Sequence, residues 1–245
     1  MTVSAPVFLV DELPESDRAV LDGPEGRHAA TVRRIRPGEQ VHLSDGTGGV
    51  AECAVVEADH DRLALTVLRR SRLAPPDPRF VVVQALPKGE RGELAVELLT
   101  EVGVDRVVPW SSDRAVARWR GERGARALTR WRSTAREAAK QSRRAWVPEV
   151  AELHSTRQVC ALIAGSAAAV VLDPGARVPL ADVPLTDSGD IVLVVGPEGG
   201  LTEGELTAFR ASGARLARLG PTVLRTSTAG PAALSVLAVR TNRWR

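Results

Sequence analysis

Two unbroken apolar runs, at residues 168–172 and 191–195, constrain the fold of this chain most strongly. A strand with one face in water alternates apolar and polar residues, whereas neither run alternates, so both faces of these strands must be covered. Helical patterns separate them from the other apolar runs, which predicts a mostly parallel sheet with helices on both faces. The expected strands are 80–85, 106–110, 168–172, 191–195 and 215–219, the expected helices are 90–102, 123–142, 202–212 and 228–240, and 159–164 fits either.

A proline cluster divides the chain into two domains. Pro75, Pro76 and Pro78 resist both helix and central strand, which is typical of a linker. Before this cluster, short strands are expected at 40–43, 50–57 and 63–68, and an Asp-Gly pair supplies turn chemistry after the first. We therefore expect a compact β-barrel-like module over residues 1–74 and an α/β domain over 75–245.

Basic residues gather in one part of the chain. The segment from Arg114 to Arg144 holds eleven basic and two acidic residues, so its net charge is +9, whereas the rest of the chain carries −6. On the helix expected at 123–142, the apolar residues share one face and Arg126, Arg130 and Lys140 lie on the other. Such an excess attracts nucleic acid phosphates, although it is also compatible with a simply solvated helix face.

Several classes of protein are disfavoured by what the sequence lacks. No apolar run approaches the roughly 20 residues of a membrane span, and residues 1–10 have no basic start typical of a signal peptide. Cys53 and Cys160 each lie in an apolar run, and the four histidines show no ligand spacing. We expect a cytoplasmic protein without a disulfide framework, a bound metal or a membrane partner.

The segment 191–205 is the strongest local signal for a binding site. A buried strand is followed by the tight turn Gly196-Pro197-Glu198-Gly199-Gly200, and a helix then begins at Thr202-x-x-Glu205, a capping box. Ligands of α/β proteins bind at the carboxyl ends of the strands, where glycines let the backbone approach them closely. An ordinary connection between strand and helix remains the alternative, and nucleotide hydrolysis is disfavoured because the Walker Gly-Lys-Ser/Thr is absent.

A second loop, at residues 219–229, repeats this arrangement. Gly220 and Pro221 turn the chain, and Val223 and Leu224 can form an apolar wall. Arg225 can face an anion, and the hydroxyl groups that follow it can cap the last helix.

Together the two loops, VVGPEGGLTEGEL and RLGPTVLRTSTA, resemble those of the SPOUT methyltransferases, and in particular the enzymes that methylate N3 of a uridine in 16S ribosomal RNA. HAATVRRIRPGEQVHLSDGTGG at 28–49 is similar to their N-terminal PUA-like barrel, and ALPKGERGELAVELLTEVGVDRVVPWSSDRAV and RWRSTAREAAKQSRR are similar to parts of their catalytic domain. The resemblance covers nearly the whole chain. It implies a C-terminal SPOUT domain with a trefoil knot, S-adenosylmethionine as cofactor, and a homodimer.

The resemblance also implies the site residues. Arg225 would stabilise negative charge on the uracil oxygens, and Glu198 would either accept its proton or organise the turn. Cofactor contacts would come from both loops and from the end of strand 168–172: Leu172, Gly196, Glu198, Gly199, Gly200, Leu219, Leu224, Thr226 and Ser227. Contacts to 16S ribosomal RNA, which we expect to be the substrate within the small ribosomal subunit, would come from Arg34, Arg36, Lys88, Arg114, Arg136 and Gln141.

One position departs from the family pattern. Many members carry Arg-Thr-Glu-Thr-Ala in the last loop, whereas this chain carries Arg225-Thr-Ser-Thr-Ala229. Ser227 cannot replace the charge of that glutamate. Two alternatives to uracil-N3 methylation therefore stay open: a SPOUT methyltransferase with another RNA target, and a ribosome-assembly protein that binds RNA without catalysis.

Overall fold

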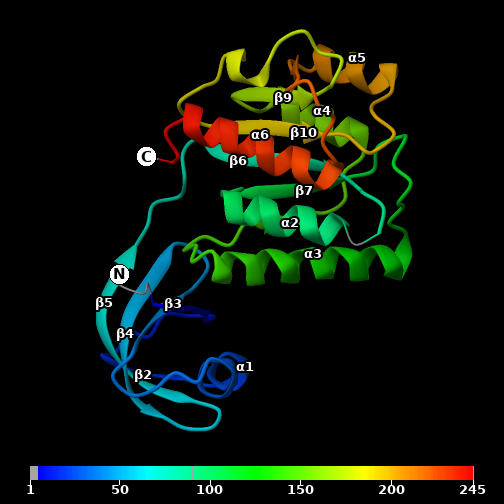
Figure 1. The fold of residues 1–245 in the computed structure, drawn as a ribbon. Helices are drawn as coiled ribbons and strands as arrows, with labels where there is room; N and C mark the ends of the chain where they lie inside the picture. The colour runs from blue at the N-terminus through cyan, green and yellow to red at the C-terminus, as the bar shows by residue number, and fades with distance from the viewer. Residues whose placement is uncertain (1–4, 90, 245) are drawn as a thin grey trace. The chain divides into compact units, whose positions relative to one another are not determined.

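The computed structural model describes residues 5–89 and 91–244 (Figure 1). The chain forms two compact units, of which the first comprises Met1–Pro75 together with Ala139–Val147, and the second comprises Pro76–Ala138 together with Pro148–Arg245. No helix in the described part of the chain has the length and hydrophobicity that crossing a bilayer requires.

The first unit is built on a five-stranded sheet with the order β1-β3-β4-β5-β2. β3, β4 and β5 form antiparallel neighbours, and β1 lies parallel to β3. Along β4 and β5, alternate residues such as Cys53 and Leu65 are buried in a single apolar core. The strands are β1 (Val7–Leu9), β2 (Arg18–Leu21), β3 (Gln40–Ser44), β4 (Gly49–Ala58) and β5 (Leu63–Arg72).

The segment Ala139–Val147 belongs to this first unit because it packs against the N-terminal chain. Lys140 is 5% exposed and donates a 2.8 Å hydrogen bond to Glu25 Oε1 of α1 (Gly23–Arg27). The main chain of Gly48 donates to the carbonyl of Ala145. The expectation that Lys140 lies on an exposed basic helix face is wrong, because its charge is buried and paired with a carboxylate.

The second unit contains a six-stranded, fully parallel sheet with the order β11-β9-β10-β6-β7-β8. The strands are β6 (Arg79–Ala85), β7 (Arg106–Trp110), β8 (Glu149–Val150), β9 (Ala168–Leu172), β10 (Asp190–Val195) and β11 (Arg215–Ala217). Residues 191–195 are all buried, at 2% exposure or less. The prediction of a parallel sheet covered on both faces is confirmed.

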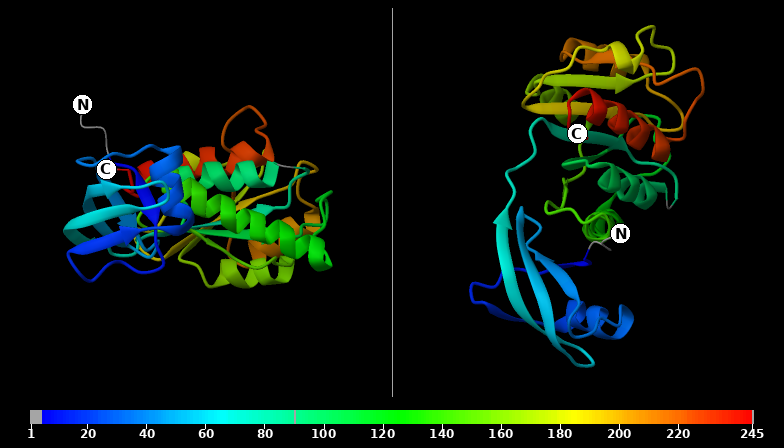
Figure 2. Two further views of the ribbon diagram at one scale, coloured as in Figure 1. Left: turned by 90° about the horizontal axis from the view of Figure 1, so that it is seen from below. Right: turned by 60° about the vertical axis from the view of Figure 1, so that its left-hand side comes forward.

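Helices cover both faces of this sheet (Figure 2). Residues of α2, α3 and α6 share one apolar core with β6 and β10, and residues of α4 and α5 share a second core on the opposite face. Their bounds are α2 (Arg91–Val102), α3 (Gly121–Gln141), α4 (Thr156–Ala164), α5 (Glu203–Ala211) and α6 (Thr226–Arg240). The ambiguous segment 159–164 belongs to α4. This helix begins after Ser155, whose side chain forms a capping box with Gln158.

The path from β9 to α6 is the least regular part of the second unit. After β9 the chain runs through residues 173–189 to β10, which lies on one side of β9, and β11 later lies on its other side. The connection of residues 173–189 pairs with the residue that follows β11, since Leu180 N–H donates to the carbonyl of Arg218 at 2.8 Å. After β11 the chain returns across the sheet as α6, which packs on α2, β6 and β10.

Arg243 ties the end of the described chain to the start of the sheet. Its guanidinium donates to both carboxylate oxygens of Asp105, at 2.9 and 3.3 Å, and to the carbonyls of Pro78 and Gly103. It also lies 4.6 Å from the centroid of the Phe80 ring. One side chain thus joins β6, the turn before β7 and the segment after α6.

We predict that Arg243→Met lowers the free energy of unfolding by roughly 2 kcal/mol, because it removes several partly buried, charge-assisted hydrogen bonds. Urea denaturation followed by circular dichroism measures this. Arg210→Met, at an exposed position of α5, is the control and should change little. Equal stability of the two variants would contradict the proposed role of Arg243.

Candidate functional site

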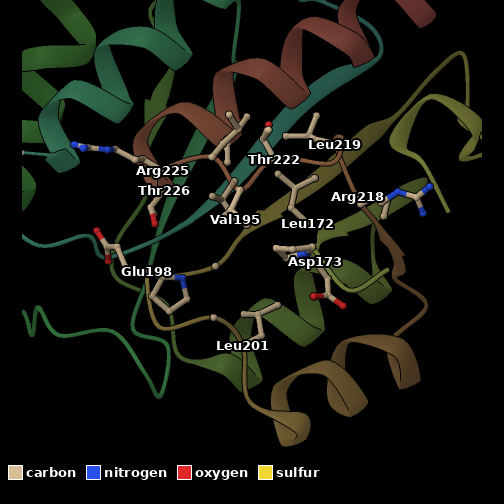
Figure 3. Close-up of a pocket in the computed structure, with 18 of the residues that line it drawn as sticks. Leu172, Asp173, Val195, Glu198, Leu201, Arg218, Leu219, Thr222, Arg225 and Thr226 are labelled. Atoms are coloured by element: carbon tan, nitrogen blue, oxygen red, sulfur yellow. The ribbon is translucent and has the colours of Figure 1, made fainter. Parts of the chain in front are cut away.

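The two glycine-proline loops meet at one cavity because of the strand order. β9 pairs with β10 on one side and with β11 on the other, so the carboxyl ends of all three strands lie together. A cavity of about 350 Å³ opens there (Figure 3). It is lined by Leu172, Asp173, Pro174, Val195, Gly196, Pro197, Glu198, Gly200, Leu201, Ala217, Arg218, Leu219, Gly220, Thr222, Val223, Leu224, Arg225, Thr226 and Ala229.

The cavity has an apolar middle and polar ends. Leu172, Val195 and Leu219 lie between the two loops, whereas Glu198 and Arg225 lie at one end and Asp173 and Arg218 at the other (Figure 3). Such a site suits an elongated ligand that has a flat apolar portion and polar groups on either side of it.

The first loop contains one glycine in a left-handed conformation and another in close contact with a side chain. Gly200 has a φ of +71°, a backbone conformation that residues other than glycine and asparagine rarely adopt. At Gly196, an added Cβ would lie 3.1 Å from the Leu201 side chain, which the loop folds back against it. The loop ends in the predicted capping box, in which Thr202 and Glu205 exchange hydrogen bonds.

The residues predicted to contact a cofactor fall into two groups. Leu172, Gly196, Glu198, Gly200, Leu219, Leu224 and Thr226 line the cavity. Gly199 and Ser227 do not. Gly199 instead packs against Arg114, and Ser227 is 2% exposed within the first turn of α6.

The two predicted catalytic residues both lie at this cavity. Arg225 immediately precedes α6 and its side chain is exposed, with no acidic partner for its guanidinium in the described ranges. Glu198 lies in the first loop, where its Oε1 is 3.9 Å from Nη1 of Arg91. Arg225 is therefore available to a bound anion, whereas Glu198 already faces a cation.

Comparison with known proteins identifies this arrangement. A family model described as an RNA methyltransferase domain matches residues 75–238, and another described as an RNA methyltransferase PUA domain matches residues 21–68. The ribosomal RNA small subunit methyltransferase E of Mycobacterium tuberculosis is 49% identical over 245 residues, covering 98% of this chain and 94% of that protein. The chain belongs to the ribosomal RNA small subunit methyltransferase E family.

More distant similarities are found both in sequence and in structure. The Bacillus subtilis protein of the same name is 28% identical, with 96% of this chain and 94% of that protein covered. A methyltransferase E from Neisseria gonorrhoeae bound to S-adenosylmethionine superposes with a TM-score of 0.82 at 28% identity, covering 96% of this chain and 98% of that one. A Legionella pneumophila methyltransferase with bound S-adenosylmethionine gives 0.85 at 26% identity, covering 97% and 98%.

The residues predicted to contact RNA are divided between the two units. Arg34, Arg36 and Gln141 belong to the first unit, and Gln141 borders a small pocket together with His28 and Arg33. Lys88, Arg114 and Arg136 belong to the second unit. Lys88 and Arg136 are exposed, and the guanidinium of Arg114 donates to main-chain carbonyls of the first cavity loop.

Some residues of the cavity wall were not predicted from the sequence. Asp173 and Pro174 directly follow β9, at the same edge of the sheet as the two loops. The sequence Asp173-Pro174-Gly175 at the end of an apolar run is a turn signal that could have indicated them. Arg218, at the far end of the cavity, gave no comparable signal.

We predict that Gly200→Val destabilises the protein by about 1–2 kcal/mol, because a β-branched residue resists the left-handed conformation. Gly200→Asn, which tolerates that conformation, is the matched control and should lose less. An added Cβ meets nothing within 4 Å, so crowding does not complicate the comparison. Urea unfolding of both variants provides the measurement, and a valine variant as stable as the parent would refute the backbone argument.

Proposed function

We propose that this chain transfers the methyl group of S-adenosylmethionine to N3 of a uracil in 16S ribosomal RNA of the small ribosomal subunit, in the cytoplasm. The observation that carries the proposal is the single cavity formed where the two glycine-proline loops meet. Support comes from the methyltransferase E relatives, which cover nearly the whole chain, and from similar structures bound to S-adenosylmethionine.

The residues present fit this cofactor. The cavity volume of about 350 Å³ lies within the range of small-molecule sites. Leucine and valine side chains of both loops can enclose an adenine ring, and Gly196 and Gly220 also line the cavity without side chains that would cover their main chain. We assign the cofactor contacts to the seven predicted residues that line the cavity, and not to Gly199 and Ser227, which lie outside its lining. When bound, S-adenosylmethionine supplies an electrophilic methyl group on a sulfonium.

The chain's own residues then have to make uracil nucleophilic. N3 of uracil carries a proton, and its loss places negative charge on the ring oxygens. Arg225 and the amino-terminal end of α6, which begins at Thr226, both favour negative charge at this end of the cavity. We propose Arg225 as the catalytic residue that stabilises this charge, while the loops hold the base in line with the methyl group.

Glu198 is the proposed acceptor of the N3 proton. It lines the same end of the cavity as Arg225 (Figure 3). Arg91 lies beside its carboxylate at 3.9 Å and can hold it in place. If Glu198 accepts the proton, Glu198→Gln should lose activity. If Glu198 only organises the turn, that variant should retain activity.

We further propose a trefoil knot and a homodimer. In this arrangement, the segment that leads from β11 to α6 passes through the loop formed by residues 173–189. The pairing of that loop with Arg218 on the outer side of β11, and the return of α6 across β10, support the proposal. Val223 and Leu224, which are exposed apolar residues of the cavity lining, are candidates for the dimer contact.

RNA binding is proposed for the basic residues that lack an acidic partner. On and near α3, Arg126, Arg130 and Arg132 are each paired with a glutamate, whereas Arg120, Arg123 and Arg136 are exposed with no such partner among the described residues. Arg34, Arg36, Lys88 and Gln141 remain candidates, and phosphate contacts from such side chains would position the RNA.

Nucleoside mass spectrometry of 16S ribosomal RNA tests the proposed function. We predict that deleting the gene removes 3-methyluridine and that restoring it brings the nucleoside back. Persistence of 3-methyluridine together with loss of another methylated nucleoside would indicate a different RNA target. An unchanged set of methylated nucleosides would contradict the catalytic function.

For Arg225→Ala we predict a loss of about 10²–10³-fold in kcat with the fold intact, since the variant removes a charge that acts on the transition state. Single-turnover methylation of ribosomal RNA measures this loss. Arg210→Ala, with the same charge change on an exposed helix position, is the control. A rate like that of the parent would remove Arg225 from the mechanism.

Two triple variants separate free from paired arginines. We predict that replacing Arg120, Arg123 and Arg136 by glutamine weakens RNA binding and lowers the salt slope by roughly 2, because up to three phosphate contacts are lost. Replacing Arg126, Arg130 and Arg132 makes the same charge change but removes cations already paired, and should have a smaller effect. Identical slopes for the two variants would show that ion pairing does not decide which arginines bind RNA.

A further inference from the structure

The first cavity loop is held from outside the cavity by the segment that follows β7. Nη1 of Arg114 donates to the carbonyls of Gly199 and Leu201, at 3.3 and 3.2 Å. These two carbonyls flank Gly200, the loop position with the left-handed backbone. Arg114 therefore holds the peptide group that leads into Gly200 and the one that follows Leu201.

Glu205 makes a second link between the same two segments. This side chain is 2% exposed, and its Oε1 accepts a hydrogen bond from the Asp113 main chain at 2.9 Å. Its other oxygen accepts from the main chain of Thr202 at 2.8 Å and from the Thr202 hydroxyl at 3.0 Å. One buried carboxylate thus joins the end of the cavity loop, the start of α5 and the segment after β7.

The surroundings of Gly199 also show that the cavity loop lies close to the segment after β7. A Cβ added at Gly199 would lie 3.3 Å from Cβ and 3.4 Å from the carbonyl oxygen of Arg114. Its φ is not in the left-handed region, and a Cβ there would require Arg114 to shift by a few tenths of an ångström. Gly199, which the family resemblance assigns to the cofactor, thus lies against Arg114 and outside the cavity lining.

We propose that Arg114 and Glu205 are positioning residues that hold the loop of residues 196–201 in the form that binds the cofactor. The proposal rests on the proposed function, because it assigns that loop to S-adenosylmethionine. It replaces the expectation that Arg114 contacts RNA. The guanidinium is committed to two carbonyls of the loop, and Arg118 holds the same segment by donating to the carbonyls of Ser112 and Asp113.

Arg114→Met tests the proposal most cleanly. Methionine keeps an unbranched stem against Gly199 and removes the hydrogen-bond donors together with their charge. We expect the Kd for S-adenosylmethionine, measured by calorimetry, to rise about tenfold, and the loss of activity to appear in the KM for the cofactor rather than in kcat. RNA affinity should stay within about twofold of the parent, since no phosphate contact is lost.

Arg120→Met is the matched control, because it removes the same charge from an exposed position six residues further along. It should weaken RNA binding and leave the affinity for S-adenosylmethionine unchanged. Glu205→Gln provides a second test. One amide oxygen cannot accept from both Asp113 and Thr202 as two carboxylate oxygens do, so cofactor binding should weaken while RNA binding is retained.

The outcomes separate this inference from the proposed function. If the unmodified protein binds S-adenosylmethionine and Arg114→Met binds it equally well, the positioning role is wrong while the proposed function stands. A variant that loses RNA affinity and keeps cofactor affinity would restore Arg114 as an RNA contact and overturn the inference. Failure of the unmodified protein to bind the cofactor would overturn both.

Discussion

The position of β9 between β10 and β11 is the constraint on which the rest of the site depends. Val170 pairs with Leu193 on one side and with Arg215 on the other, in parallel register. Because neighbouring strands lie about 5 Å apart, the loops that leave β10 and β11 begin roughly 10 Å from one another, on either side of the end of β9. A cavity between them follows from hydrogen bonding of the sheet, and side chains only decide its size and polarity.

The shape of the site depends largely on the main chain of the first loop. The first loop turns at a glycine with positive φ, and its carbonyls are held by a guanidinium that lies outside the cavity. Apolar side chains make up most of the middle of the wall. This arrangement suits a family whose cofactor carries its own reactive group, because the protein then needs to orient rather than to activate it.

Much of the fold could be predicted from the sequence because its signals are local. The runs at β7 and β9 and the capping box at Thr202 follow from neighbouring residues, and the structure places them as expected. The burial of Lys140 could not be predicted, since its partner Glu25 is 115 residues away. Likewise, the basic residues of α3 looked alike in sequence, and only the structure separates arginines paired with glutamates from those without such partners.

The central claim is that residues 196–201 and 219–226 together enclose S-adenosylmethionine. A crystal structure of the protein grown with the cofactor tests it most directly. The account predicts electron density for the adenosyl group between Leu172, Val195 and Leu219, with the sulfonium toward the end of the cavity where Arg225 and Glu198 lie. Density for the cofactor elsewhere on the chain, or two loops that lie apart with the cavity closed, would contradict it.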